Sequence, residues 1–470
     1  MIKNYREPNV YSTVKRKQPR VPATIVDMYP LVIGTGVEDY AFENVTKDYK
    51  ITAATEEIIL TDVTADDEIV SIAVFKGADE IKGATFELSD VGDGVKAWKA
   101  VLPEVTSDNE TLTITVGIAN PERHKLQRFT GTGAVEEFYG PKYYDGEINK
   151  ISLGAQIALD SGAGVVYVLQ VCQSKGETLL DAYKRAIDDQ VVEIPGNPVW
   201  RTQSVDNDDA VREYLMEFVN TMSAPEERSE KYAALNNKDA ESKTTVADVT
   251  ESFKGFVEKS LARPNIYSAY RYQTFYPNQA VYTFETEDGE KDQTIGGEFI
   301  AIAIAGAEQL LERESQSLTC STIPAYIFKS LKGVKMKRSE KNALAAYGVT
   351  LLTQDEENGA ITVRDSLSMD VSTEQTSDPC VTRAVDYGAK YVRAQLHPYL
   401  GKYNIDAETI SKVQAAATTA MSTLVSKKLF VTAEVVEIYQ NEDDLTNIIV
   451  NARFGIEYPL KTIDVNIVCD

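Results

Sequence analysis

Residues 294–309 form the sequence TIGGEFIAIAIAGAEQ, in which two glycines and a glutamate precede a run of apolar side chains. The run from Phe299 to Ala307 is the longest nearly pure apolar stretch of the chain. A membrane-spanning helix needs about 20 such residues. The stretch therefore predicts a glycine-led helix that is too short to cross a membrane.

A short helix and a hairpin are predicted after this stretch. Ser339 is placed to cap a helix that ends before Gly348. Two apolar runs within residues 349–364 are separated by Asn358 and Gly359, a pair that favours a tight turn. We therefore expect a β-hairpin there.

Two further helices follow the hairpin. Asp406 is placed to cap the second of them, and Ile405 and Ile410 are spaced as a hydrophobic staple. Lys427 and Lys428 suit the negative end of its dipole. The first helix is predicted from one apolar stripe at helical spacing: Val381, Ala384, Val385, Ala389, Val392 and Leu396.

The chain ends in strand-like segments. Strands are predicted over residues 429–439 and 447–457, and a third strand-like stretch covers residues 460–470. In this last stretch Ile463 and Val465 alternate with polar residues. A half-apolar strand at a chain end needs a sheet to join, which could be its own or that of a neighbouring copy.

The part of the chain before residue 294 predicts an α/β layer. Residues 23–36 are strand-like, and apolar residues at helical spacing within 148–159 precede a buried strand at 165–171. Asp208 or Asp209 is placed to cap another helix. Helices that alternate with apolar strands are typical of such a layer.

Two other segments have distinct patterns. Residues 45–120 contain short β-branched runs separated by polar turns, which predicts a small sandwich or barrel with an acidic surface. The polar stretch 236–245 predicts a loop.

The charge of the chain is strongly negative. Its 470 residues contain 72 acidic and 48 basic side chains, for a net charge of −24, which disfavours nucleic acid and anionic membrane as partners. Residues 1–20 instead carry a net charge of +5 and two prolines. They are expected to be an extended basic arm that lies on an acidic neighbour, or a solvated tail.

No motif for an enzyme or a cofactor is present. The chain lacks a P-loop, a complete dinucleotide fingerprint and a nucleophile elbow. Two histidines and four widely spaced cysteines predict no metal site. Whether Cys469 forms a disulfide between subunits is left open. We therefore expect no catalytic, cofactor-binding or metal-binding residues.

Residues 329–341, KSLKGVKMKRSEK, form a basic cluster in this acidic chain. Apolar residues lie among its lysines, so part of it is expected to pack. The cluster is a candidate electrostatic contact with an acidic protein, and a plain basic surface loop is the alternative. The candidate contact residues are Lys332, Lys335, Lys337 and Arg338.

The order of these segments resembles the contractile tail sheath proteins of bacteriophages and contractile injection systems. The likeness covers about residues 120–470, and no single motif is diagnostic. It is carried by YGPKYYDGEINKISLGAQIALDSGAGVVYVLQV (139–171), TIGGEFIAIAIAGAEQ (294–309), IPAYIFKSLKGV (323–334), AAYGVTLL (345–352), VTRAVDYGAKYVRAQLHPYLGKYN (381–404) and IDVNIVCD (463–470).

The resemblance implies an α+β fold class, a mixed α/β multidomain chain with a sheath-type C-terminal domain. It divides the chain into an extended N-terminal arm (1–22), a middle α/β domain (23–44 and 121–295), an inserted β-rich domain on the outer surface (45–120), a C-terminal α/β domain facing the tube (296–459) and a C-terminal strand arm (460–470).

The resemblance also implies a function and partners. Such subunits polymerise as stacked hexameric rings around an inner tail tube, and each lends both arms to sheets of neighbouring copies. They contract by rigid-body rearrangement to drive the tube through the host envelope. The residues expected to be buried by the arms are Val10, Tyr11, Val14, Ile463, Val465 and Ile467.

Further partners would be baseplate and tail terminator proteins at the ends of the sheath, with no nucleic acid and no membrane insertion. The expected location is the virion tail, after assembly in the cytoplasm of the bacterial host. The basic cluster becomes a candidate contact with the tube. Alternative functions are a baseplate component, a subunit of an S-layer-like surface array and an α/β hydrolase.

Overall fold

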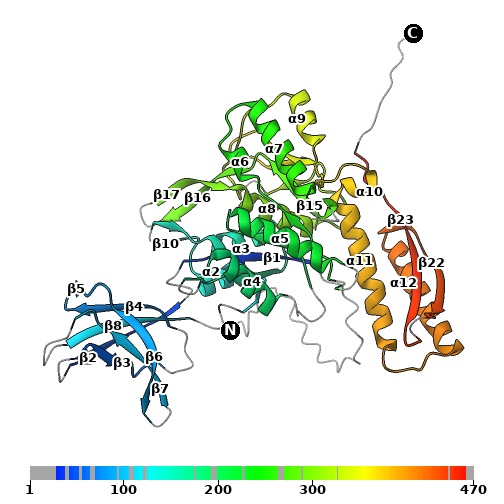
Figure 1. Cartoon of the computed structure of the whole chain (residues 1–470). Coiled ribbons are helices and arrows are strands. Elements are labelled where there is room, and N and C mark those ends of the chain that lie inside the picture. Colours follow the sequence, from blue (N-terminus) through cyan, green and yellow to red (C-terminus); the bar gives the residue numbers. More distant parts are fainter. Residues whose placement is uncertain are drawn as a thin grey trace, which may run out of the picture. The chain divides into compact units, whose positions relative to one another are not determined.

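The computed structural model divides the chain into two compact units, with boundaries at residues 386/387 and 455/456. We call residues 28–386 with 456–461 the body, and residues 387–455 the C-terminal unit (Figure 1). The structure describes residues 28–461 except for 38–41, 52–54, 64–68, 93–94, 105–110, 120–122, 124, 145, 174–175, 192–197, 225–226, 228, 263–268, 287–288, 325 and 443–444.

A parallel sheet lies at the centre of the body. Strand β1 (Tyr29–Gly34) pairs in parallel with β12 (Val166–Gln170) on one side and with β13 (Val199–Ser204) on the other. Strand β9 (Gln127–Phe129) pairs antiparallel with β12 and completes this four-stranded sheet. The buried apolar runs predicted at residues 23–36 and 165–171 therefore become neighbouring strands.

Helices cover both faces of this sheet because side chains alternate along each strand. Val32 of β1 packs in one apolar cluster with α3 (Lys150–Asp160) and α8 (Gly297–Ala307). Its neighbours Leu31 and Ile33 pack in another cluster with α4 (Leu179–Gln190) and α5 (Asp209–Met222). Alternation along β1 thus sets the layers of the body.

A second sheet of five strands continues the first one. Tyr232 forms a parallel bridge with Arg201 of β13, and the Tyr232 amide donates to the Trp200 carbonyl at 2.8 Å. The sheet order is β14 (Ala233–Ala234), β15 (Tyr272–Tyr276), β20 (Val349–Gln354), β21 (Ile361–Asp365) and β18 (Thr322–Ile323).

The predicted domain boundary at residues 295/296 lies between segments that pack together in the body. Strands β15 and β20 lie on opposite sides of that boundary in sequence and pair in parallel. The apolar cluster around α8 also contains residues from both predicted domains. Segments on the two sides of this boundary therefore share one core and one sheet, and the division into domains stays a prediction.

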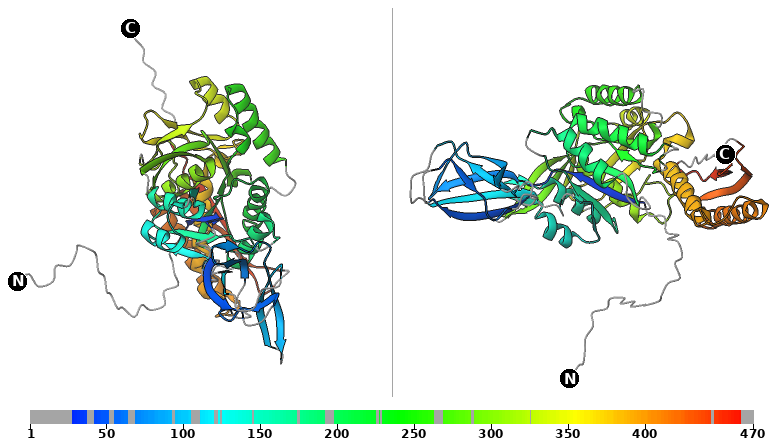
Figure 2. Two further views of the ribbon diagram at one scale, coloured as in Figure 1. Left: turned by 90° about the vertical axis from the view of Figure 1, so that its left-hand side faces the viewer. Right: turned by 60° about the horizontal axis from the view of Figure 1, so that its bottom comes forward.

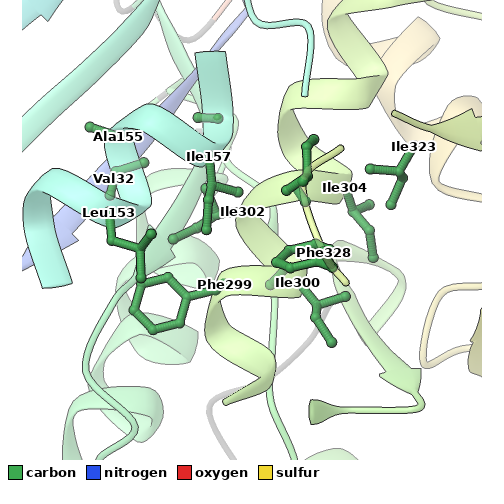
Figure 3. Packing of buried hydrophobic residues seen from close by; sticks show 14 of the residues in the cluster. Val32, Leu153, Ala155, Ile157, Phe299, Ile300, Ile302, Ile304, Ile323 and Phe328 are labelled. Atoms are coloured by element: carbon green, nitrogen blue, oxygen red, sulfur yellow. The ribbon is translucent and has the colours of Figure 1, made fainter. Parts of the chain in front are cut away.

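Helix α8 is buried on all sides, as a helix without a polar face must be (Figure 3). Phe299, Ile300, Ile302 and Ile304 are all at most 3% exposed. Helices α3 and α8 approach so closely at Gly306 that a Cβ atom there would lie 2.3 Å from the Ala158 carbonyl oxygen. Glycine at this position permits the contact.

The hairpin predicted around Asn358 is present, with β20 and β21 paired antiparallel. Asn358 adopts a φ of 58°, which asparagine tolerates better than most residues. The expected helix before it is α9 (Arg338–Ala345), but Ser339 does not cap it. The cap is Lys337, two positions earlier, whose backbone amide donates to the Glu340 carboxylate at 2.6 Å.

The loop predicted at residues 236–245 is wrong in part. It contains the short helix α6 (Lys238–Glu241), and Asn236 and Asn237 are buried. The Asn278 side chain donates to the Asn236 side chain at 3.1 Å and to the Asn237 carbonyl at 2.7 Å. These polar residues are buried because they satisfy one another.

Residues 42–119 form two antiparallel sheets around one apolar cluster, visible as a block of strands without helices (Figure 2). Ile58, Val74, Ala100 and Leu112 lie in this cluster and are at most 7% exposed. The sheets are β2 (Phe42–Lys50), β8 (Thr111–Ala119), β4 (Ile69–Lys76) and β5 (Asp79–Glu80), and β3 (Glu57–Ile59), β7 (Val95–Val101) and β6 (Thr85–Gly92).

The C-terminal unit contains the end of α11 (Pro379–Leu396), followed by α12 (Ala407–Ser426), β22 (Phe430–Gln440) and β23 (Ile448–Ile456). The last residue of β23, Ile456, belongs to the body.

The predicted helix caps are confirmed in both units. Asp208 accepts the Ala210 amide at the start of α5, and Asp406 accepts the Thr409 amide at the start of α12.

The remaining elements of the body lie around these layers. Among the described residues, no helix combines the length and apolar character needed to span a membrane. The elements are α2 (Thr132–Tyr139), β10 (Tyr143–Tyr144), β11 (Glu147–Ile148), α7 (Val246–Leu261), β16 (Gln279–Thr286), β17 (Gly289–Gly296), β19 (Ser330–Lys332) and α10 (Glu374–Ser377).

The contact at Gly306 predicts a measurable cost for a single methyl group. Gly306→Ala should destabilise the protein by about 1–3 kcal/mol, because the added Cβ overlaps backbone that cannot give way. Gly255→Ala, in α7 where nothing lies within 4 Å of the new Cβ, should stabilise by about 1 kcal/mol through helix propensity. Urea unfolding of both variants tests this, and equal effects would disprove the close contact.

Candidate assembly surfaces

The ribbon β22–β23 is packed on one side by helices of its own unit. Helix α12 lies along β22, and buries Val413, Ala417 and Leu424 (Figure 2). At the base of the ribbon the rings of Phe430 and Phe454 stack at 4.3 Å. Both rings lie against Gly388 of α11, where a Cβ would come within 2.9 Å of Phe430. Glycine in α11 thus lets the ribbon lie close to this helix.

The edges of the ribbon are unpaired among the described residues. There, β22 and β23 pair only with each other, although they are 11 and 9 residues long. Val431 is 64% exposed and Val436 is 56% exposed, and alternation along β22 places them on opposite faces of the strand. Long unpaired edges beside exposed apolar side chains are the features that accept an added strand. Sequence reasoning found these strands but not that their edges are unpaired.

The predicted contact residues of the two arms cannot be placed on this surface. Val10, Tyr11 and Val14, and Ile463, Val465 and Ile467, all lie outside the described residues. Their role in inter-subunit contacts stays a prediction.

The basic cluster 329–341 lies along β19 and the start of α9. Phe328 next to it is fully buried, and Val334 and Met336 are half-buried, so the expected packing is confirmed. Lys329 forms ion pairs with Asp292 at 2.5 Å and Glu357 at 3.5 Å. The four candidate contact residues, Lys332, Lys335, Lys337 and Arg338, are exposed.

A groove beside this cluster is lined by side chains of both charges. Lys335 and Lys341 line it together with residues 355–357, which are Asp-Glu-Glu. Leu351 and Met336 are among its apolar lining residues. Sequence reasoning missed the acidic lining, because the turn that carries it is distant in the chain from the lysines.

Many α/β proteins bind ligands at the edge formed by the carboxyl ends of their parallel strands. In this chain that edge is filled by the protein's own side chains. Asp206 accepts hydrogen bonds from the Thr35 amide at 2.8 Å and from Tyr183 at 2.8 Å, and Lys150 approaches it at 3.0 Å. The cavity beside Asp206 and Glu298 has a volume of only about 30 Å³. That is room for one or two water molecules.

Glu298 at the start of α8 is the most perturbed carboxylate at this edge. Its pKa is raised to about 7: burial is the main cause and neighbouring Glu241 adds to it, while hydrogen bonds from its own backbone amide and from Asn236 act in the opposite direction. The Asn236 amide group donates to both carboxylates, at 3.2 Å to Glu298 and 2.6 Å to Glu241. No group of His, Cys, Asp or Glu among the described residues could hold a metal ion.

Three solved structures resemble the chain closely enough to compare. The sheath of the anti-feeding prophage in its contracted state has a TM-score of 0.53 at 13% identity, and covers 75% of this chain and 90% of that one. The baseplate of the same particle gives 0.56 at 12% identity with the same coverage. The contracted PVC sheath of an extracellular contractile injection system has a TM-score of 0.53 at 12% identity. The match covers 74% of this chain and 87% of that one.

The chain has the contractile sheath fold. The predicted fold class, a mixed α+β sheath-type chain, is confirmed at this level. No protein-family model and no curated protein matches the sequence. At 12–13% identity the likeness to sheath structures concerns the fold alone.

Glu298 predicts a pH dependence of stability. Its pKa is about 7 in the folded chain against 4.5 as the reference value, so the folded state binds more protons between these values. The free energy of unfolding should therefore fall as pH rises from about 5 to 8. Glu298 alone should account for about 3 kcal/mol of this loss.

Unfolding of Glu298→Gln across the same pH range measures this contribution. The variant should lose this part of the slope, whereas Glu258→Gln, at an exposed position of α7, should keep it. A wild-type slope that survives in Glu298→Gln would show that another group causes it.

Proposed function

We propose that the chain is a structural subunit of a contractile tail sheath that polymerises as stacked hexameric rings around an inner tail tube. The observation that carries the proposal is the sheath fold combined with the open edges of β22–β23. A ribbon of two strands is marginal alone and gains backbone hydrogen bonds when further strands join it. Arms of neighbouring copies are the proposed strands.

The N-terminal arm (1–22) and the C-terminal arm (460–470) each contain apolar residues, and those of the C-terminal arm recur at every second position. The proposed buried residues are Val10, Tyr11 and Val14 in one arm, and Ile463, Val465 and Ile467 in the other. The net charge of +5 on residues 1–20 would also offset repulsion between subunits whose other residues carry −29.

Contraction would need no catalysis. The folded subunits would slide and rotate as rigid bodies into a packing with more buried interface, while the arms keep them linked. A few hundred Å² of extra apolar burial per subunit would supply several kcal/mol, at about 25 cal/mol per Å². Summed over many copies, this could drive the tube through a host envelope without a nucleotide.

The division into domains carries over as part of the proposal. The β-rich segment 45–120 would decorate the outer surface, and the C-terminal domain (296–459) would face the tube. The subunit would be assembled in the cytoplasm of a bacterial host and reside in the virion tail. Baseplate and terminator proteins would bind the ends of the sheath.

The tube contact is assigned to Lys332, Lys335, Lys337 and Arg338. These cations are exposed and follow one another along the end of β19, the segment after it and the first residue of α9. The acidic residues that line the adjacent groove would select against a purely acidic partner surface and favour a surface that carries both charges.

A baseplate component is the second candidate. One of the similar structures is a baseplate, and its TM-score of 0.56 is as high as those of the sheaths. A baseplate protein would form a closed ring, whereas a sheath subunit would form long hollow cylinders. Electron microscopy of the purified protein distinguishes the two.

Removal of the N-terminal arm tests the link between subunits. Deleting residues 1–20 should abolish polymers and leave a folded, soluble subunit, because the described apolar clusters of the body are built from residues after position 30. Negative-stain images and unfolding curves of both chains give the result. Tubes formed by the truncated chain would refute the role of the arm.

Charge reversal tests the contact with the tube. Lys335→Glu with Lys337→Glu should lower the amount of sheath that assembles on purified tubes at least tenfold, since two attractive contacts per subunit become repulsive. Lys254→Glu with Lys259→Glu on α7 is the matched control. Equal loss in both double variants would indicate a general effect of charge.

A further inference from the structure

The segment that follows β23 is held against the body by charged side chains. Glu457 lies 3.6 Å from Arg313, but both side chains are about 40% exposed, so this pair contributes little. Lys461 is more enclosed, with 28% of its side chain exposed. Its ammonium group lies 3.1 Å from Asp378, 3.4 Å from Asp365 and 3.4 Å from the Ser366 carbonyl.

The three acceptors match the three donors of a lysine ammonium group. Burial disfavours the charge on Lys461, but Asp378 and Asp365 outweigh this effect and raise its pKa. Lys461 therefore stays charged while it is held in this site.

Asp378 is the main partner, and it also caps α11. Its side chain is 2% exposed, accepts the Cys380 amide at 3.0 Å and accepts the Ser317 hydroxyl at 2.8 Å. A buried carboxylate requires both hydrogen bonds and a nearby cation. Lys461 supplies positive charge from the far end of the described chain, 83 positions after Asp378.

We propose that Lys461 is an anchor that fixes the starting point of the C-terminal arm on the body of its own subunit. The notion of an arm rests on the proposed function, whereas the anchoring contact does not. The anchor makes the free segment begin at residue 462, and a pull on that segment is resisted at the cap of α11.

The anchor shifts the point from which the following segment can extend. Without the anchor that point lies after β23, at residue 457, and with the anchor it lies five positions later, at residue 462. At about 3.4 Å per extended residue, the anchor shortens the reach of the following segment by about 17 Å. The anchor would thus restrict which neighbouring copies the arm can join.

Limited proteolysis of the soluble, full-length subunit tests the anchor. Leu460 is an exposed chymotrypsin site within the anchored segment, whereas the bond after Tyr458 is protected by Pro459. Lys461→Gln should accelerate cleavage after Leu460 at least tenfold, because a segment without its anchor fits the protease more readily. Lys461→Arg should restore slow cleavage, and Lys243→Gln, which removes a lysine of similar exposure paired with Asp239, should leave it slow.

A second measurement needs no variant. In the wild-type subunit, Lys461 should react with an amine-acylating reagent at least ten times more slowly than exposed Lys335. Unchanged proteolysis in Lys461→Gln, or equal acylation of Lys461 and Lys335, would overturn the anchor.

Both tests use unpolymerised protein, so they are separate from the proposed function. A subunit that shows the anchor but never forms tubes would refute the sheath function alone. A wild-type subunit that forms tubes but fails the proteolysis and acylation tests would refute the anchor alone.

Discussion

Backbone groups that leave water must be hydrogen-bonded, and this constraint acts differently on the two units of the chain. In the body, a four-stranded and a five-stranded sheet join through the bridge between Arg201 and Tyr232, so the central strands are paired on both sides. In the C-terminal unit, β22 and β23 pair only with each other among the described residues. The body can therefore be stable as a subunit, while the ribbon is suited to take further strands.

Buried charges lie between the sheet and the start of α11. Arg271 donates to both carboxylate oxygens of Asp386, at 2.8 and 3.0 Å, and Trp200 donates to the same carboxylate at 2.8 Å. Arg201 forms a second buried pair with Glu308. Removing one partner of such a pair commonly costs about 3–5 kcal/mol. The contacts of Asp386 with Arg271 and Trp200 hold the first turns of α11 to the body, so a load on that helix would be resisted by a buried ion pair.

Local patterns were sufficient to predict most of the elements. The apolar spacing of α3 and α11, the caps Asp208 and Asp406, and the turn at Asn358 were all correct because each depends on neighbours within a few residues. The layers of the body follow from the same patterns once the strands are paired.

Long-range partners were not predictable in this way. The buried asparagines at 236 and 237 look like loop residues until Asn278 is placed beside them. The boundary at residues 295/296 follows a change of pattern in the sequence, but β15 and β20 pair across it. Lys461 and Asp378 carry no periodic signal, and only the fold brings them together. The arm residues remain predictions because they lie outside the described part of the chain.

The central claim is that strands from other copies complete the ribbon of the C-terminal unit. A cryo-electron microscopy map of the assembled polymer tests it directly, at a resolution that separates neighbouring strands. The account predicts that terminal segments of adjacent subunits are hydrogen-bonded to the outer edges of β22 and β23. Termini that fold back on their own subunit, or that hang free in a complete polymer, would contradict it.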